Sequence, residues 1–454
     1  MATVTLDTYA EVLKTIYLPA IQENLNHSTI LSDLIDVNET DVSGKDAKIE
    51  MHYGRSTGIG ARKDNEALPA ANYQKFIQAT VPMKYQYGRI QVSGPTMAAT
   101  RDERGAYAKA LDAEIRGIVT DLKKDVNRQL WGAGHGLLAR WNTGATTALT
   151  VQKMYRGNSD GVDGFGSTFG AKYLPVGTGA TPVVATISSG TVGTYVVDAT
   201  DIAPTVLTKG TDYDSLTVSN AGVDEAVGTF YVRFSAAVAS LGADSLTAGV
   251  NRKEMMGLRG IITNTDLDEI SFNNGTYIGL TVVDPLQGLL VGTYDWFAAI
   301  VNAHSSGRYE GQRALSLNLM DKMFDDVEES AGKDYGPDLI LTTRALRREY
   351  TDLCRADRRY VNTMTLDGGW KAIDYNGVPF TVDNDAIDGE IYFITTRDLA
   401  IYRMSDYNWM DKDGAVLSRV ANYDAYEAIL FRYAELGCKR RNSHGVLCDL
   451  SYTL

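Results

Sequence analysis

The sequence predicts an α+β fold built from several units, and three observations support this class. Apolar residues at helical spacing run through 102–131, alternating apolar and polar residues within 47–92 indicate strands, and a Gly-, Thr- and Val-rich region covers 143–250 between parts of mixed pattern. The chain has 454 residues, enough for roughly two to four structural units. We therefore expect more than one compact domain.

Residues 1–46 predict an N-terminal arm. Apolar residues recur at helical spacing from Asp7 to about Asn26, which indicates a short amphipathic helix that Pro19 kinks or splits. Between Ser32 and Val42 this period is lost. We expect that stretch to be extended.

Residues 47–92 predict an extended loop built as a β-hairpin. Odd-numbered apolar residues alternate with polar ones from Ile49 to Tyr53, and again from Val81 to Tyr87. The polar, glycine-rich segment 54–72 between them is too long for a tight turn. Because a two-stranded ribbon is marginal in water unless something covers it, we expect this loop to project and to be stabilised by a second copy of the chain.

The strongest local signal is a helix over 102–131. Apolar residues from Tyr107 to Leu130 fall on one stripe, and charged residues occupy the remaining positions. At 1.5 Å per residue such a helix is about 45 Å long. We expect this helix to be a long rigid element that crosses the subunit.

Residues 143–250 predict an inserted all-β module, a small sandwich or barrel. Short runs rich in Val, Thr and Tyr are separated there by Gly, Asn and Asp, and Lys and Arg are scarce. After Arg252 the pattern is again mixed. We expect a helix over 314–330, a buried strand at 339–341 and a second helix capped by Thr342 or Thr343.

The composition limits the possible functions. The apolar share of 44% and charged share of 22% are typical of a folded chain and argue against extended disorder. With 44 basic and 57 acidic side chains the net charge is -13, which disfavours a nucleic-acid reader. Cys354, Cys438 and Cys448 are widely spaced and odd in number, so we predict reduced, packed thiols.

No targeting segment is indicated. The N-terminus lacks the pattern of a secretion signal, and no stretch reaches the roughly 18 consecutive apolar residues of a membrane span. We expect synthesis and folding in the cytosol and no membrane partner.

Metal chemistry is weakly supported by the spacing of ligand-type residues. Asp383, Asp385, Asp388 and Glu390 suggest part of a calcium loop, but Ile387 breaks the twelve-residue pattern, and we interpret the segment as a solvated turn. The cysteines and His444 include no C-x-x-C pair that would nucleate a zinc site.

The sequence does not match known catalytic motifs either. The glycines of 164–170 match neither a dinucleotide nor a phosphate loop, and no nucleophile elbow or obvious histidine partner exists. We therefore predict no catalytic residue, no metal ligand and no cofactor.

A cluster of arginines follows the strand at 339–341 and has two interpretations. It is either a solvated helical face with internal ion pairs, or a ring of salt bridges between neighbouring subunits. Its members are Arg344, Arg347, Arg348, Arg355, Arg358 and Arg359.

The order of these parts resembles that of tailed-bacteriophage major capsid proteins with the Hong Kong ninety-seven-like fold. The resemblance covers nearly the whole chain apart from the β insertion. Its most specific part is the C-terminal region, where GVPFTVDNDAIDGEIYFITTRDLAIY (377–402), NWM (408–410) and DAYEAILFRYAELGCKRR (424–441) are similar to the family's succession of buried, display and returning strands.

The resemblance implies a division of the chain into seven parts. They are an N-terminal arm (1–46), an extended loop (47–92), a peripheral domain (93–142) with its spine helix (102–131), the β-rich insertion (143–250), a return to the peripheral domain (251–289), an axial domain (290–415) and C-terminal strands (416–454).

The resemblance also implies a function. Such a chain assembles with itself into hexamers and pentamers of an icosahedral head shell, encloses double-stranded DNA without reading its sequence, and has scaffolding, portal and decoration proteins as further partners. It is found in the virion, and in the host cytoplasm during assembly.

Contact residues follow from the same resemblance. The loop residues Arg55, Lys63 and Lys75 and the arginine cluster are the candidate subunit contacts. In some relatives a loop lysine is joined to an asparagine of another subunit, so Lys63 and Lys75 are the candidates for such a crosslink, although exposed lysines in polar loops are common.

Three other classes remain open. The first is an encapsulin-like nanocompartment shell of the same fold, which would enclose an enzyme instead of a genome. The second is a β-rich tail or adhesin component, which the middle region suggests but the long helix opposes. The third, an enzyme, lacks a convergent set of residues.

Overall fold

The structure is a computed structural model. It describes residues 30–95, 104–134, 137–145, 148–152, 184–188, 196–198, 204–209, 213–218, 231–234, 254–264, 285–304, 313–356, 363–365, 371–411 and 416–451. The expected N-terminal helix at 7–26 and the glycine-rich segment 164–170 lie outside these residues.

A five-stranded sheet is built around one long strand, β22 (Ala425–Cys438). β20 (Leu399–Trp409) pairs with it antiparallel, and β5 (Lys84–Ser93) pairs along its other edge from Ala425↔Ser93 to Ala434↔Lys84. The short strands β21 (Ser418–Arg419) and β1 (Val37–Asn38) complete the sheet, β1 running parallel to β20.

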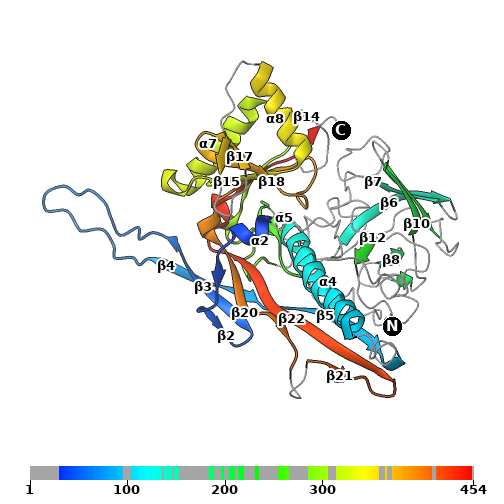
Figure 1. The fold of residues 1–454 in the computed structure, drawn as a ribbon. Coiled ribbons are helices and arrows are strands. Elements are labelled where there is room, and N and C mark those ends of the chain that lie inside the picture. The colour runs from blue at the N-terminus through cyan, green and yellow to red at the C-terminus, as the bar shows by residue number, and fades with distance from the viewer. Residues whose placement is uncertain are drawn as a thin grey trace.

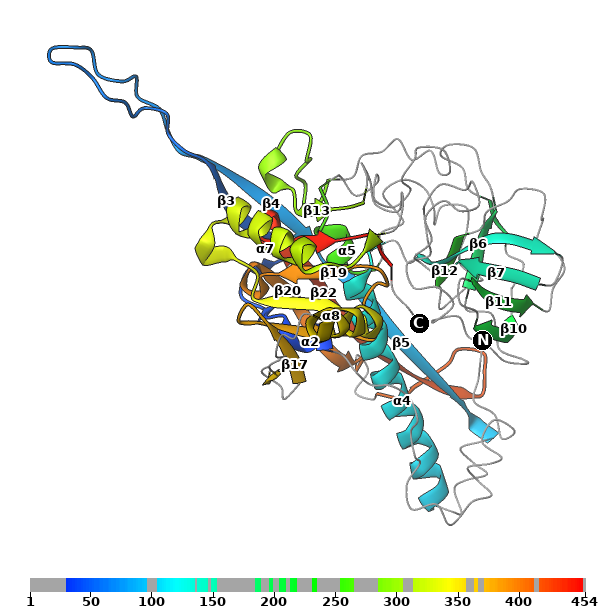
Figure 2. The same ribbon diagram turned by 90° about the horizontal axis from the view of Figure 1, so that it is seen from above.

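The helix expected over 102–131 is α4 (Arg104–Trp131), which lies along this sheet (Figures 1 and 2). Its C-terminal half buries Leu122, Val126 and Leu130, as the apolar stripe predicts. Contact with β5 is close, because a Cβ added at Gly88 would lie 2.9 Å from Cγ1 of Ile118. Glycine at this position lets the helix and strand approach each other.

β3 (Asp46–Gly54) and β4 (Lys75–Pro82) form an antiparallel hairpin, and β2 (Val42–Ser43) pairs with β3. The segment between β3 and β4 projects far from the rest of the chain (Figures 1 and 2). The second strand of the hairpin thus begins at Lys75.

The alternation from Val81 to Tyr87, expected to be one strand, is divided at Met83. Val81 and Met83 are buried, whereas Tyr85 and Tyr87 are half exposed, at 52% and 53%. The buried side changes from odd to even positions because β5 leaves the hairpin and pairs with β22.

A seven-stranded mixed sheet forms the second layer, in the order β13-β23-β19-β15-β18-β17-β16. Its strands are β13 (Ile300–Asn302), β15 (Leu339–Thr342), β16 (Thr363–Thr365), β17 (Lys371–Tyr375), β18 (Val378–Val382), β19 (Ile391–Ile394) and β23 (Gly445–Leu447). Beside it β14 (Arg313–Ala314) and β24 (Leu450–Ser451) pair in parallel.

Two helices cover one face of this sheet, α7 (Leu317–Ala331) and α8 (Arg344–Ala356). Met320 of α7 and Leu346 of α8 join one buried cluster with Ile340 and Phe380 of the sheet. The expected cap of α8 is not made. Thr342 Oγ1 donates to Glu390 O at 2.8 Å, and Thr343 Oγ1 has no hydrogen-bond partner among the described residues.

The described strands between 137 and 234 form one seven-stranded antiparallel sheet, in the order β10-β11-β7-β6-β12-β8-β9. They are β6 (Leu137–Ala145), β7 (Ala148–Gln152), β8 (Val184–Ser188), β9 (Val196–Asp198), β10 (Pro204–Lys209), β11 (Tyr213–Val218) and β12 (Tyr231–Phe234). The first strand begins before the expected start at 143. Closure as a sandwich or barrel stays a prediction.

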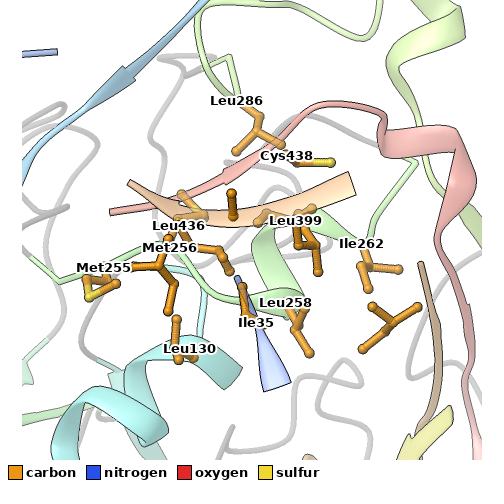
Figure 3. Close-up of a cluster of buried hydrophobic side chains, with 14 of the residues drawn as sticks. Ile35, Leu130, Met255, Met256, Leu258, Ile262, Leu286, Leu399, Leu436 and Cys438 are labelled. Atoms are coloured by element: carbon orange, nitrogen blue, oxygen red, sulfur yellow. The ribbon is translucent and has the colours of Figure 1, made fainter. Parts of the chain in front are cut away.

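The main core lies where the five-stranded sheet, the seven-stranded mixed sheet and the hairpin meet. Leu130 of α4, Leu258 of α5 (Leu258–Ile261), Leu399 of β20 and Leu436 of β22 come together in it (Figure 3). Cys438 is buried here, and Cys354 and Cys448 are also buried and free, so the predicted packing role of the cysteines is confirmed. No helix of the described ranges is long and apolar enough to cross a membrane.

Candidate functional site

The projecting loop, residues 55–74, is held by its own hydrogen bonds. Ser56 Oγ donates to Asn72 O at 3.0 Å, Arg62 Nε donates to Ala67 O at 2.9 Å, and Lys63 N donates to Glu66 Oε2 at 2.8 Å. All hydrogen bonds recorded for its side chains in the described ranges stay within the hairpin. The loop is therefore hydrogen-bonded to itself and not, through its described side chains, to the body of its own subunit.

The base of the hairpin, in contrast, is firmly attached. Tyr53 stacks on Trp296 with ring centroids 5.5 Å apart and meets Tyr294 edge-on at 6.1 Å. Thr80 N donates to Gln287 O at 2.9 Å on the other strand. These contacts fix the direction in which the loop leaves the subunit.

Four large apolar side chains of the hairpin face solvent. Their exposed fractions are 84% for Ile59, 84% for Leu68, 73% for Tyr73 and 69% for Phe76. Isolated exposed apolar residues are common, but a series along a loop without its own core marks a contact surface. The sequence analysis missed these residues, although apolar residues within an otherwise polar loop were a usable signal.

The predicted contact residues Arg55, Lys63 and Lys75 are all exposed on this hairpin. None of the three side chains forms an ion pair among the described residues. Their position leaves them accessible to another chain, and their roles as contacts and as crosslinking lysines stay predictions.

α8 carries Arg344, Arg347, Arg348 and Arg355 of the predicted arginine cluster. Arg355 Nη1 lies 3.0 Å from Asp352 Oδ1, an exposed ion pair within the helix. Arg344, Arg347 and Arg348 have no ion-pair partner in the described part of the chain. The cluster therefore has one internal pair and three available guanidinium groups; Arg358 and Arg359 lie outside the described residues.

The segment around Asp383 is a buried latch, and its interpretation as a solvated turn was wrong. Asp383 is 2% exposed, Asp385 is 3% exposed and Glu390 is fully buried. Asp383 Oδ2 accepts from Leu31 N at 3.1 Å, and Asn127 Nδ2 donates to Asp385 Oδ2 at 2.7 Å. Burial raises the pKa of Asp383 above its ordinary value.

This latch fixes the base of the N-terminal arm. Asn127 lies on α4 and also accepts a hydrogen bond from Ser32 N at 3.3 Å, so one amide joins the helix, the turn and α2 (Ile30–Leu34). Further along, Ile401 N donates to Asp36 O at 2.8 Å. Residues 30–38 are thus attached to their own subunit.

Arg128 closes one side of a neck where the β-rich region leaves and rejoins the fold. Its guanidinium donates to both carboxylate oxygens of Glu254, at 2.8 and 3.2 Å, and to Asp125 at 2.9 Å. The side chain is 2% exposed. Burial alone would lower the pKa of Arg128, but the two carboxylates outweigh it and raise the pKa.

The other side of the neck uses two backbone amides. Gln129 Oε1 accepts from Met255 N at 3.0 Å, and Glu435 Oε1 accepts from Met256 N at 2.6 Å. Burial raises the pKa of Glu435 to about 7, although Lys84 and the hydrogen bonds from the amides of Met256 and Leu436 act in the opposite direction.

No group of three or more His, Cys, Asp or Glu side chains in the described ranges is placed to hold a metal ion. His444 is buried, accepts from Thr395 N at 3.2 Å, and has its pKa lowered to about 3 by burial. It is therefore a neutral packing residue at ordinary pH.

Together, a projecting hairpin, a long helix along a five-stranded sheet and a helix-covered mixed sheet make up the arrangement expected of the Hong Kong ninety-seven-like fold. The capsid asymmetric unit of Cyanophage A-1(L) is similar over 98% of this chain and 99% of that chain, with a TM-score of 0.53 and 13% identity. This likeness shows the fold and confirms the α+β, Hong Kong ninety-seven-like prediction.

More distant structures include the holo-SrpI encapsulin complex from Synechococcus elongatus and the capsid of Myoviridae Phage XM1. The encapsulin has a TM-score of 0.46 and 8% identity, with 100% of this chain and 99% of that chain covered. The XM1 capsid has a TM-score of 0.45 and 8% identity, with 97% and 98% covered. No protein-family model matches the chain, and no curated protein is similar to it in sequence.

Proposed function

We propose that this chain is the major capsid protein of a tailed phage, which assembles with itself into hexamers and pentamers of an icosahedral head shell. The observation that carries the proposal is the projecting loop 55–74. It exposes Ile59 and Leu68 almost completely, and the hydrogen bonds of its described side chains stay within the hairpin. A ribbon of this kind gains its stability when a neighbouring copy covers it.

The physical mechanism combines rigid and adaptable parts. α4 and the two sheets keep their shape, while the hairpin reaches a neighbour from a fixed base at Tyr53. Heterologous contacts repeated around closed axes multiply weak interfaces through the whole assembly. Modest contacts in each pair of subunits are therefore sufficient.

The further parts of the proposal follow from the same function. The shell encloses double-stranded DNA without sequence-specific contacts, in keeping with a net charge of -13. Scaffolding, portal and decoration proteins are its proposed partners, and the protein acts in the virion after assembly in the host cytoplasm. We propose a purely structural role, with the seven-part division of the chain predicted above.

The test is assembly of the purified chain and of loop variants. Wild-type protein should give closed particles in electron micrographs and a fast-sedimenting species in ultracentrifugation. The double variant Ile59→Asp/Leu68→Asp should remain folded but lose at least nine-tenths of these particles, because two carboxylates would be buried at the contact.

Asn65→Asp/Ala71→Asp is the matched control, since it adds the same charge at exposed positions of the same loop without replacing a large apolar residue. It should assemble within about twofold of wild type, a change of less than 1 kcal/mol. Soluble wild-type protein that stays monomeric at high concentration would overturn the proposal. Particles that enclose a protein instead of nuclease-protected DNA would favour the nanocompartment alternative.

A further inference from the structure

Two helices of opposite charge cover the same face of the seven-stranded sheet. α7 has five acidic side chains and one basic one, whereas α8 has four arginines and two acidic side chains. Both bury their apolar sides in one cluster, so the charged sides remain at the surface. Figure 2 shows the two helices as separate rods on this part of the subunit.

The arginines of α8 lie on one flank of the helix. Arg344, Arg347, Arg348 and Arg355 are spaced so that they fall on one side of the helical wheel, and Asp352, which pairs with Arg355, borders that side. The first three have no ion-pair partner among the described residues. Three of the four guanidinium groups in this arginine row are thus uncompensated by described side chains, and the row keeps a net positive charge.

The acidic residues of α7 form a matching stripe. Asp321, Asp325 and Glu329 are exposed at spacings of four residues, opposite the buried Met320 and Met323. Asp321 accepts a hydrogen bond from the Tyr375 hydroxyl at 2.5 Å, but no described cation forms an ion pair with this stripe. It is an uncompensated negative surface.

The two surfaces do not neutralise each other within one chain. α7 packs on β13 and β23 and α8 packs on β18, and the two helices approach each other at Tyr375 of β17, whose hydroxyl donates to Asp321 and whose ring lies 6.0 Å from that of Tyr350. No ion pair between α7 and α8 is formed by their described side chains. Each copy therefore offers both halves of a charge-complementary contact.

We propose that the arginine row of α8 docks on the acidic stripe of α7 of the adjacent copy, and that this contact repeats around each capsomer. The proposal rests on the self-assembly proposed above and names the partner of the arginine cluster. A contact between two different surfaces of identical chains closes into a ring when its rotation is the right fraction of a turn.

Repetition compensates for the weakness of each contact. An exposed ion pair contributes little by itself, but one interface holds several and each ring repeats the interface five or six times. Opposite surface potentials also orient subunits before they touch and reject the wrong faces. At roughly 0.15 M salt such fields reach about 8 Å, so assembly should slow as salt rises.

The experiment reverses each surface separately. Arg344→Glu/Arg348→Glu and Asp325→Lys/Glu329→Lys should each reduce assembled particles at least tenfold at low salt, while circular dichroism and monomer size remain as in wild type. The variant with all four substitutions restores opposite charges at every interface. It should assemble within about threefold of wild type, equivalent to less than 1 kcal/mol.

A mixing experiment tests the head-to-tail arrangement. When the two double variants are combined, an acidic α8 meets a basic α7 at one interface, and a basic α8 meets an acidic α7 at the next. Alternation closes only in rings with an even number of copies. Mixing should therefore recover hexamers, sheets or tubes but not shells that contain five-membered rings.

The controls separate this inference from the proposed function. Wild-type protein that fails to assemble would remove the capsid assignment itself. If wild type assembles and both double variants assemble equally well, only the α7–α8 contact is refuted. Folded double variants that fail to assemble, with no recovery in the fourfold variant or the mixture, would refute the pairing as well.

Discussion

Asn127 joins three parts of the fold, and replacing it by alanine should release the base of the N-terminal arm. Its amide donates to Asp385 at 2.7 Å and accepts from Ser32 N at 3.3 Å, and the residue is fully buried. A hydrogen bond to a carboxylate contributes about 1.5–3 kcal/mol and a neutral one about 0.5–1.5 kcal/mol. The local cost is therefore about 2–4 kcal/mol.

This cost converts into a measurable rate. If the arm base opens locally, the amides of Leu31 and Ser32 should exchange with deuterium roughly 30- to 1000-fold faster, at 1.4 kcal/mol per factor of ten. Peptides from the centre of β22 provide an internal reference that should not change. Local exchange is the right measurement because it reports opening of the arm base separately from unfolding of the rest of the chain.

Asn318→Ala on the exposed surface of α7 is the matched control, and it should leave exchange at residues 30–36 unchanged. Equal protection of these residues in wild type and Asn127→Ala would refute the latch. So would a loss of protection spread evenly over β22, because it would indicate global destabilisation.

Three further predictions test other parts of the structure. Trp296→Ala removes the ring on which Tyr53 stacks, so amide exchange at Tyr53 and Gly54 should rise about 3- to 30-fold. Unchanged exchange would show that this stacking does not hold the base of the hairpin. Glu435 has a pKa raised to about 7 by burial, so it binds its proton more tightly in the folded state than in the unfolded one. Its contribution to the stability of the fold is therefore complete below about pH 4.5 and is lost as the pH rises through 7. Glu435→Gln should therefore flatten the decline in thermal stability between pH 5 and 7.5, on the order of 3 kcal/mol, and an unaltered slope would contradict this. Gly88→Val forces a side chain against Ile118, so the melting temperature should fall, with a loss of about 1–3 kcal/mol of folding stability. Gly44→Val separates crowding from backbone strain, because no atom lies within 4 Å of that position but its φ is +70°.

The sequence predicted best where one element carries its own pattern. The stripe from Tyr107 to Leu130 has the helical period, and α4 ends at Trp131, as expected. The strand at 339–341 was also visible because it is continuously apolar, and all residues of β15 are buried.

Prediction failed where a residue's environment comes from a distant part of the chain. Asp383 and Asp385 occur in a segment with the composition of a turn, but Asn127, 256 and 258 positions earlier, hydrogen-bonds to them. Composition reports only the local preference for turns. It contains no information on the partner that makes burial of these carboxylates possible.

The division at Met83 shows the same limit in a strand. Apolar residues continue at odd positions from Val81 to Tyr87, so the period is unbroken, while the buried side changes. Tyrosine is apolar enough to continue a pattern and polar enough to remain at a surface. Periodicity therefore identified strands but not where one sheet ends and the next begins.

The two ends of the β-rich region lie side by side at the neck. A Cβ built on Gly134 would lie only 3.5 Å from Glu254 O, so the chain departs and returns at almost the same point. Arg128 and Glu435 hold the returning end, at Glu254 and Met256, against the rest of the fold. Because its ends are neighbours, this region can lengthen, shrink or be exchanged for a foreign domain without moving α4 or β22, which makes the junction a natural grafting point.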